Sequence, residues 1–379
     1  MRRLFGCVLI CFMIVVLLLS GCTLFDGDAP AETGEETSLK VGSTAEETMD
    51  KEVTVMKEYR LKEHLDAVKV IGRSAVVDAG ITCDWTASGI SLALECEGDV
   101  SVKVLSDQMA YFTVIVDGVR QSERVKAQAG TATIPLAKGL EKGIHEISVL
   151  KQTENTNAMC IFHSVSFAGR FVERPADRDL YIEFYGDSIT CGYGNLAEQS
   201  SVTSPGSALW QDGTQTYAFR TAEALGADWS MISVSGIPFS KGYTSYTMGD
   251  IMEKVNWRRF EAAYDFARKP DLVVINLGTN DAQCGAELND VKLRAEEMIR
   301  CLKGHYGADQ RILFVTCMMN SNCRAQLLEV IAACGGVGSG IFEMQSVESN
   351  RFGANGHPDM TAHKDVAEEL ISFIRANIF

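Results

Sequence analysis

The segment Tyr181–Thr190 joins an apolar, alternating run directly to Gly186-Asp187-Ser188. The alternation over residues 181–185 predicts a strand. A serine held in a tight turn at the carboxyl end of a strand exposes its hydroxyl and its own N–H at the edge of a sheet, where a nucleophile is needed. The same tripeptide is common in loops, so this segment alone leaves an ordinary Asx turn open.

Three later segments repeat the pattern of apolar residues next to a polar cluster. Residues 229–234 lead into Ser235-Gly236, residues 271–277 into Gly278-Thr279-Asn280-Asp281, and Asn355-Gly356-His357-Pro358 precedes an amphipathic helix predicted over residues 361–378. The order Ser188, Gly236, Asn280, His357 resembles the four blocks of the SGNH (GDSL-like) hydrolase superfamily, over residues 179–379. This resemblance implies a doubly wound parallel α/β sheet with its site at the carboxyl ends of the strands.

The chemistry of ester hydrolysis asks for the same residue types. A neutral serine hydroxyl needs a base within hydrogen-bond reach, and His357 is the candidate because its ordinary pKa near 6.5 leaves it mostly neutral at physiological pH. The negative oxygen of a tetrahedral intermediate needs fixed donors. We predict that the N–H groups of Ser188 and Gly236 and the side-chain amide of Asn280 form this oxyanion hole.

One position departs from the superfamily pattern. The aspartate common three residues before the histidine is replaced by Ala354. We hypothesise that a main-chain oxygen orients His357 in its place, so that Ser188 and His357 act as a dyad. Asp359 is a less favoured substitute, because Pro358 stiffens the turn between them. His363, at the start of the last helix, is interpreted as a packing or solvated residue.

The N-terminus predicts the location of the protein. Arg2 and Arg3 precede an apolar run over residues 4–19 and then Ser20-Gly21-Cys22, which is the layout of a secretory signal and resembles a bacterial lipobox. Residues 1–22 are therefore expected to be a lipoprotein signal peptide, with Cys22 lipidated and the protein anchored at the bacterial cell surface. A transmembrane anchor is the alternative, although the run is short for a span. Residues 23–51 are acidic, lack apolar periodicity and are predicted to form a flexible tether.

Residues 52–170 are predicted to form an antiparallel, jelly-roll-like β-sandwich, followed by the hydrolase domain over residues 171–379. Short strands are expected over residues 90–96, 102–105, 111–116 and 145–150, separated by turn signals at Asp117-Gly118, Lys138-Gly139 and Lys142-Gly143. A sandwich before an SGNH domain resembles carbohydrate esterase family 2, as do the segments Gly143–Glu154 and Gly186–Gly194. That resemblance implies removal of acetyl groups from plant-wall and related sugars, and members without the triad acid fit Ala354.

The expected partner is therefore an acetylated carbohydrate such as xylan or another hemicellulose. The formal net charge of −15 disfavours nucleic acid and acidic polysaccharides. An esterase or lipase for another small ester, and a catalytically silent glycan-binding lipoprotein, remain as alternatives. Four aromatic residues near the motifs are candidates for stacking on sugar rings, with ordinary packing as the favoured role of each: Tyr193, Trp210, Phe239 and Tyr243.

No cofactor or metal is predicted, since no Cys-x-x-Cys pair is present. Nine cysteines remain after Cys7, Cys11 and Cys22 are set aside, and they are interpreted as small buried hydrophobic residues, with one or two disulfides left open. The charged segment 287–303 predicts an amphipathic helix. Its buried side is expected to comprise Leu288, Val291, Leu293, Met298, Ile299 and Leu302.

Overall fold

The computed structural model describes residues 55–198, 202, 204, 206–256, 258, 262–319, 323–346 and 350–379. The predicted signal peptide, Cys22 and the tether lie outside these residues. Within the described part of the chain, no helix combines the length and apolar character needed to cross a membrane.

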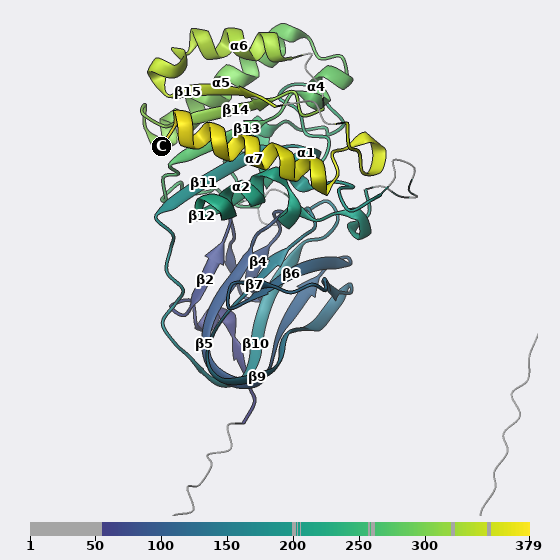
Figure 1. Cartoon of the computed structure of the whole chain (residues 1–379), viewed down its shortest axis with the longest axis vertical. Helices are drawn as coiled ribbons and strands as arrows, with labels where there is room; N and C mark the ends of the chain where they lie inside the picture. The colour runs from purple at the N-terminus through teal and green to yellow at the C-terminus, as the bar shows by residue number, and fades with distance from the viewer. Residues whose placement is uncertain are drawn as a thin grey trace, which may run out of the picture. The chain divides into compact units, whose positions relative to one another are not determined.

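The first part of the described chain is an antiparallel sheet, labelled in Figure 1. Its path is β3-β4-β10-β5-β9-β6-β7, with β1 paired to β10, β2 to β5 and β8 to β6. Side chains from most of these strands bury one shared apolar core, as the predicted antiparallel domain requires. The strands are β1 Lys57–Arg60, β2 Val68–Ile71, β3 Val76–Val77, β4 Gly80–Cys83, β5 Gly89–Ser106, β6 Ala110–Val116, β7 Val119–Arg120, β8 Val125–Ala127, β9 Gly130–Lys151 and β10 Cys160–Phe171, and one 3₁₀ turn, η1, covers Leu61–Glu63.

Two of these strands are longer than the sequence pattern predicted. The turn signals at residues 138–139 and 142–143 lie inside β9, and the two predicted strands 90–96 and 102–105 are parts of β5. The register between β5 and β9 shifts between residues 96 and 101, and Gly139 has a φ of 59°. The glycines therefore bend a bulged strand instead of ending it. Asp117-Gly118 is a true hairpin turn, with positive φ at both residues.

The second part is a five-stranded parallel sheet in the order β12-β11-β13-β14-β15. This is the predicted doubly wound arrangement, in which the first strand, β11, lies between β12 and β13. The strands are β11 Leu180–Gly186, β12 Ala227–Ser233, β13 Leu272–Asn276, β14 Ile312–Thr316 and β15 Ile341–Gln345. The helices are α1 Ser188–Cys191, α2 Tyr217–Leu225, α3 Met248–Ile251, α4 Thr279–Gln283, α5 Leu288–Tyr306, α6 Arg324–Ala333 and α7 Met360–Asn377, with 3₁₀ turns η2 Ala208–Trp210, η3 Gly213–Gln215, η4 Gly336–Ser339 and η5 Ala354–Gly356.

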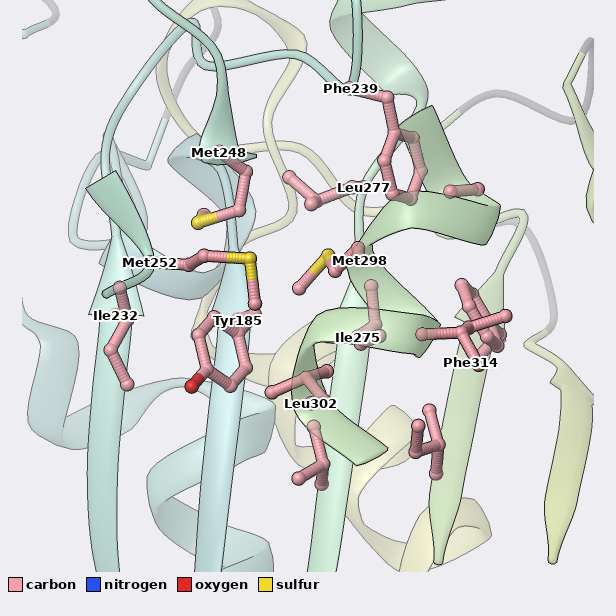
Figure 2. Close-up of a cluster of buried hydrophobic side chains, with 14 of the residues drawn as sticks. Tyr185, Ile232, Phe239, Met248, Met252, Ile275, Leu277, Met298, Leu302 and Phe314 are labelled. Atoms are coloured by element: carbon pink, nitrogen blue, oxygen red, sulfur yellow. The ribbon is translucent and has the colours of Figure 1, made fainter. Parts of the chain in front are cut away.

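Helices cover both faces of the parallel sheet. Helices α2 and α7 bury one face, where Phe184 and Val274 lie, and Figure 1 shows α7 running along it. Helices α3, α5 and α6 cover the other face, and Figure 2 shows Tyr185, Ile275 and Met298 in that core. Alternate residues of each strand thus reach opposite cores, which fixes the register of the sheet.

The buried side of α5 differs from the predicted one at two positions. Leu288 and Leu293 are each 47% exposed. Leu293 lies off the apolar stripe, and Leu288 is the first residue of the helix. The buried residues follow a 4-3-1-3-4 spacing: Val291, Ala295, Met298, Ile299, Leu302 and Tyr306.

Buried polar contacts join the antiparallel sheet to the parallel one. Arg73 donates to the carboxylate of Glu183 in β11 at 3.2 Å, and both side chains are fully buried. Lys69 donates to Asp228, at the amino end of β12, at 2.7 Å. Residues 53–379 accordingly form a single compact unit.

The cysteines of the described chain are free thiols. Those with fully buried side chains include Cys83, Cys160 and Cys191. Burial raises the pKa of each of these thiols, which keeps it protonated and unreactive. No disulfide forms among the described residues. The six buried cysteines fit the interpretation as small buried apolar side chains, whereas Cys284, Cys301 and Cys334 are only partly buried.

Candidate active site

Ser188 is the first residue of the short helix α1, which begins just after strand β11. Asp187 caps this helix by accepting the N–H of Ile189 at 3.0 Å. A Cβ at position 186 would lie 2.0 Å from Oγ1 of Thr190, so only glycine allows the helix to begin this close to the strand. The turn leaves Ser188 6% exposed at the carboxyl edge of the sheet.

His357 reaches Ser188 from the loop before α7. Its Nε2 lies 2.7 Å from Oγ of Ser188. Its Nδ1 faces the main-chain oxygen of Asn355 at 3.3 Å. A proton on Nδ1 satisfies this oxygen and leaves Nε2 free to accept from the serine hydroxyl. The contact is of the kind hypothesised for a chain with Ala354 in place of the triad aspartate.

The two other candidate groups near the histidine have structural roles. Oδ1 of Asp359 accepts the N–H groups of Thr361 and Ala362 at 2.9 and 2.8 Å and thereby caps α7. His363 is buried, and its Nδ1 accepts the N–H of Tyr217 at 3.2 Å. Burial lowers the pKa of His363 to about 3, so its imidazole is neutral. His363 is therefore a packing residue.

The predicted oxyanion donors lie beside the dyad. Gly236 follows β12 with a φ of 82°, and a Cβ there would lie 2.9 Å from the Cβ of Tyr243, so the turn requires glycine. The amide of Asn280, in α4 after β13, donates to the main-chain oxygen of Ile237 at 2.9 Å and more weakly to Asp187 at 3.3 Å. In the free site this amide is thus already oriented by two acceptors, and a substrate oxygen must compete with the longer contact.

Asp281 is a site residue that sequence reasoning did not identify. Its buried carboxylate accepts the N–H groups of Phe239, Ser240 and Lys241 at 2.8, 2.8 and 3.1 Å. It therefore fixes the loop that follows Gly236. The only sequence signal was its place directly after Asn280 in the third polar cluster.

Two buried acids lie under the site. Burial, together with the nearby charge of Asp281, raises the pKa of Asp187 to about 7. Asp187 is therefore partly protonated at neutral pH, and its charge depends on the pH of the assay.

The electrostatics of the site keep His357 neutral. Burial lowers the pKa of His357 below its ordinary 6.5, and the Asn355 carbonyl and the charge of Glu154 oppose this effect. The neutral imidazole is the form that accepts a proton. The ring of Tyr193 packs against that of His357, with centroids 4.4 Å apart, and adds to its burial.

The dyad opens into a cavity of about 310 Å³. Of the four predicted stacking aromatics, Tyr193 and Tyr243 line it, while Phe239 is buried in the core and Trp210 lies in η2, outside the lining. Tyr243 is 70% exposed although it lines the cavity. The lining comprises Ser188, Tyr193, Ser235, Gly236, Tyr243, Thr279, Asn280, Gln283, Met319, Asn355 and His357.

One group of side chains in the described chain has the composition of a metal site. Ligand atoms of Glu253, Cys301 and His305 lie within 4.8 Å of one another. Glu253 and His305 already share a 2.5 Å hydrogen bond, and the ring of His305 stacks on Phe266. The group lies outside the lining of the cavity and takes no part in the chemistry of the dyad.

Comparisons with known proteins assign both sheets. Residues 184–336 match the GDSL-like lipase/acylhydrolase family, which contains the clusters of Ser188, Gly236 and Asn280. Residues 70–175 match the carbohydrate esterase 2 N-terminal domain. The resemblance drawn from the sequence motifs is thus confirmed.

The similar proteins are esterases by name. A cellulase/esterase of Acetivibrio thermocellus is 29% identical over 78% of this chain, which spans only 38% of the length of that relative. An acetylxylan esterase/glucomannan deacetylase of Cellvibrio japonicus is 23% identical over 82% of this chain and 90% of its own length. The structure of a family two carbohydrate esterase from Clostridium thermocellum in complex with cellohexaose has a TM-score of 0.71 and 27% identity, covering 82% of this chain and 98% of that one.

Proposed function

The chain joins a carbohydrate esterase 2 N-terminal domain to a GDSL-like lipase/acylhydrolase domain, and we propose that it is a serine esterase that removes O-acetyl groups from carbohydrate. The observation that carries the proposal is the 2.7 Å contact between Oγ of Ser188 and Nε2 of His357. A nucleophile and a base within hydrogen-bond reach, with the base oriented by a third group, are the minimum for acyl transfer.

In the first step, Oγ of Ser188 attacks the carbonyl carbon of the acetyl ester while Nε2 of His357 takes the hydroxyl proton. The carbonyl oxygen becomes an oxyanion that accepts hydrogen bonds from the N–H groups of Ser188 and Gly236 and from the side-chain amide of Asn280. When the tetrahedral intermediate collapses, the imidazolium gives its proton to the departing sugar hydroxyl, and the acetyl group stays on Ser188.

In the second step, water repeats the sequence. His357 takes a proton from the water, the resulting hydroxide attacks the acetyl carbonyl, and the same donors hold the second oxyanion. Collapse returns the proton to Oγ of Ser188 and releases acetate. The Asn355 carbonyl keeps Nδ1 protonated throughout, so the ring offers the same nitrogen in both steps.

The cavity and the relatives support a carbohydrate ester as substrate. A volume of about 310 Å³ is small for a long acyl chain, whereas an acetyl group leaves room for part of a sugar. The exposed ring of Tyr243 at the rim is suited to stack on that sugar. The names of two similar proteins refer to xylan and glucomannan and to a bound cellohexaose, and we propose xylan or another hemicellulose as the substrate here.

The test is acetate release from acetylated xylan and from 4-nitrophenyl acetate, comparing residues 52–379 with the Ser188→Ala variant. Release from both substrates, abolished in the variant, is expected. A preference for butyryl and longer esters over acetyl esters would contradict deacetylation and favour an esterase for another kind of ester. No release from either substrate would favour a silent glycan-binding protein.

We also propose that the chain is a lipoprotein of the bacterial cell surface, anchored through Cys22. The support is the sequence Leu19-Ser20-Gly21-Cys22 after a basic and apolar leader. Metabolic labelling with an alkyne fatty acid should mark the wild-type chain and leave the Cys22→Ala variant unmarked. Equal labelling of both chains would refute the proposed lipid anchor at Cys22.

A further inference from the structure

Glu154 belongs to the antiparallel domain but lies under the active site of the parallel one. It follows β9 in the loop that leads to β10, and its side chain is 1% exposed. It does not line the cavity, so it cannot touch a substrate bound there. Its carboxylate nevertheless contacts the residue next to a predicted oxyanion donor.

The contact is two-fold and directed at Ser235. One oxygen of Glu154 accepts the main-chain N–H of Ser235 at 2.8 Å, and the other accepts its hydroxyl at 2.5 Å. Ser235 immediately precedes Gly236, and the peptide between them carries the N–H that faces the oxyanion. The two contacts fix the Val234–Ser235 peptide and the Ser235 side chain, so only ψ of Ser235 separates this anchored point from the Gly236 N–H.

The loop that carries Glu154 is itself held in place. Gln211 donates to the carboxylate at 3.1 Å and accepts the N–H of Glu154 at 3.0 Å. Lys151 donates to the main-chain oxygen of Thr153 at 2.6 Å, and Arg258 donates to that of Asn155. The carboxylate is therefore presented to Ser235 by a buried, hydrogen-bonded frame, as a positioning group must be.

We propose that Glu154 is a positioning residue through which the antiparallel domain orients the Gly236 N–H of the oxyanion hole. The inference rests on the proposed esterase function and extends it, because it gives the N-terminal domain a part in catalysis. Oxyanion donors act only when their geometry is fixed before the reaction, and a displacement on the order of 1 Å can cost about 100-fold in rate.

The charge of Glu154 supports a second effect on the same site. Its side-chain hydrogen-bond donors include the uncharged Ser235 and Gln211 and the thiol of Cys191. That charge raises the pKa of His357 against the opposing effect of burial. It therefore stabilises the imidazolium that forms when Ser188 is deprotonated, a task given to aspartate in a full triad.

Other groups that face the imidazole do not substitute for this charge. The hydroxyl of Ser188 and the ring of Tyr193 are neutral at the pH of catalysis, and the Asn355 oxygen is a main-chain dipole. His363, from α7, is the remaining titratable neighbour, and burial keeps it neutral.

The test compares Glu154→Gln with the wild-type chain on 4-nitrophenyl acetate. Glutamine keeps the size of the side chain and one acceptor for the Ser235 N–H, but removes the charge and places an N–H₂ group against Gln211. The kcat is expected to fall about 10- to 100-fold with KM within about 3-fold. The acid limb of the pH profile of kcat/KM should move to lower pH, because the pKa of His357 falls when the negative charge is lost.

Two further variants separate positioning from a loss of stability. Ser235→Ala removes only the hydroxyl contact and should lower kcat by roughly 3- to 10-fold, and it serves as the readout if Glu154→Gln does not fold. Lys69→Gln removes a buried contact between the same two domains at the amino end of β12, and should lower Tm without changing kcat or the pH profile. The inference would be overturned if Glu154→Gln and Ser235→Ala, like Lys69→Gln, lowered Tm but left kcat and the pH profile unchanged.

The small ester keeps the two proposals apart. Turnover of 4-nitrophenyl acetate without acetate release from acetylated xylan would refute the proposed carbohydrate substrate. The effect of Glu154 on kcat could still be measured with the small ester. If neither ester is turned over, the rate of covalent labelling of Ser188 by a fluorophosphonate, followed by mass spectrometry, replaces kcat. A slower rate in Glu154→Gln supports the inference, and an unchanged rate, or no labelling of the wild-type chain, refutes it.

Discussion

The imidazole of His357 is held by a main-chain oxygen: its Nδ1 lies 3.3 Å from the carbonyl of Asn355, two residues earlier in the chain. The 3₁₀ turn η5 brings this carbonyl under the ring, with Asn355 in the left-handed region at a φ of 53°. Asparagine tolerates this conformation better than most residues. The backbone thus orients the histidine without a buried carboxylate directly beside it.

If the Asn355 carbonyl orients His357, Asp359 is dispensable for the reaction. Asp359→Ala should lower the free energy of unfolding by about 1 kcal/mol, the usual cost of losing a helix cap, and leave kcat within about 3-fold. Thermal unfolding and 4-nitrophenyl acetate kinetics measure the two effects. A loss of several orders of magnitude in kcat at unchanged fold would make Asp359 the third member of the triad.

The acid limb of the pH profile reports the state of His357. Because burial holds the pKa of His357 below 6.5, the neutral base persists to lower pH than a free imidazole would. Wild-type kcat/KM for a small ester should therefore fall only as the pH drops below 6.5. A half-maximal value above that pH would show that the charge of Glu154 and the Asn355 carbonyl outweigh burial.

His363 should make stability depend on pH. Its pKa is about 3 in the folded chain and about 6.5 when unfolded, so the unfolded chain binds the extra proton between these values. Stability is therefore lost as the pH falls through this window, by on the order of 5 kcal/mol. His363→Asn keeps an acceptor for the Tyr217 N–H and should show a weaker pH dependence in denaturant titrations. Parallel curves for both chains would contradict the assignment.

Tyr243 should matter for sugars and not for small esters. Tyr243→Ala removes the exposed ring, and KM for an acetylated xylo-oligosaccharide should rise by roughly 2- to 13-fold, as expected for the loss of one stacking contact. Kinetics on 4-nitrophenyl acetate provide the control, since the acetyl site is intact. An equal effect on both substrates would contradict sugar stacking. It would indicate that Tyr243 instead stabilises the turn at Gly236, which it contacts.

The sequence predicted much of the parallel sheet because β11, β12, β13 and β14 are almost continuous buried runs, whereas β15, which is only partly buried, was not predicted. The predicted strand 271–277 is β13 at 272–276, and the predicted helix 361–378 is α7 at 360–377. The motif residues Ser188, Gly236, Asn280 and His357 line one cavity, because each follows an element that ends at the same edge of the sheet.

The rest depends on contacts that no local pattern encodes. Glu154 and Ser235 are 81 positions apart and belong to different domains. Asp281 acts on the loop at 239–241, which comes from another strand connection. Tyr193 has the packing role that the sequence favours, but its partner, the ring of His357, is defined only by the folded chain.

The most direct test of the account is to trap the acetyl-enzyme. The wild-type chain is mixed with an acetylated xylo-oligosaccharide, quenched in acid within the first turnovers, digested and analysed by mass spectrometry. The account predicts a transient acetyl group on the peptide that contains Ser188, absent from the Ser188→Ala variant. Acetate release without any acetylated Ser188, or release that persists in Ser188→Ala, would contradict the proposed nucleophile.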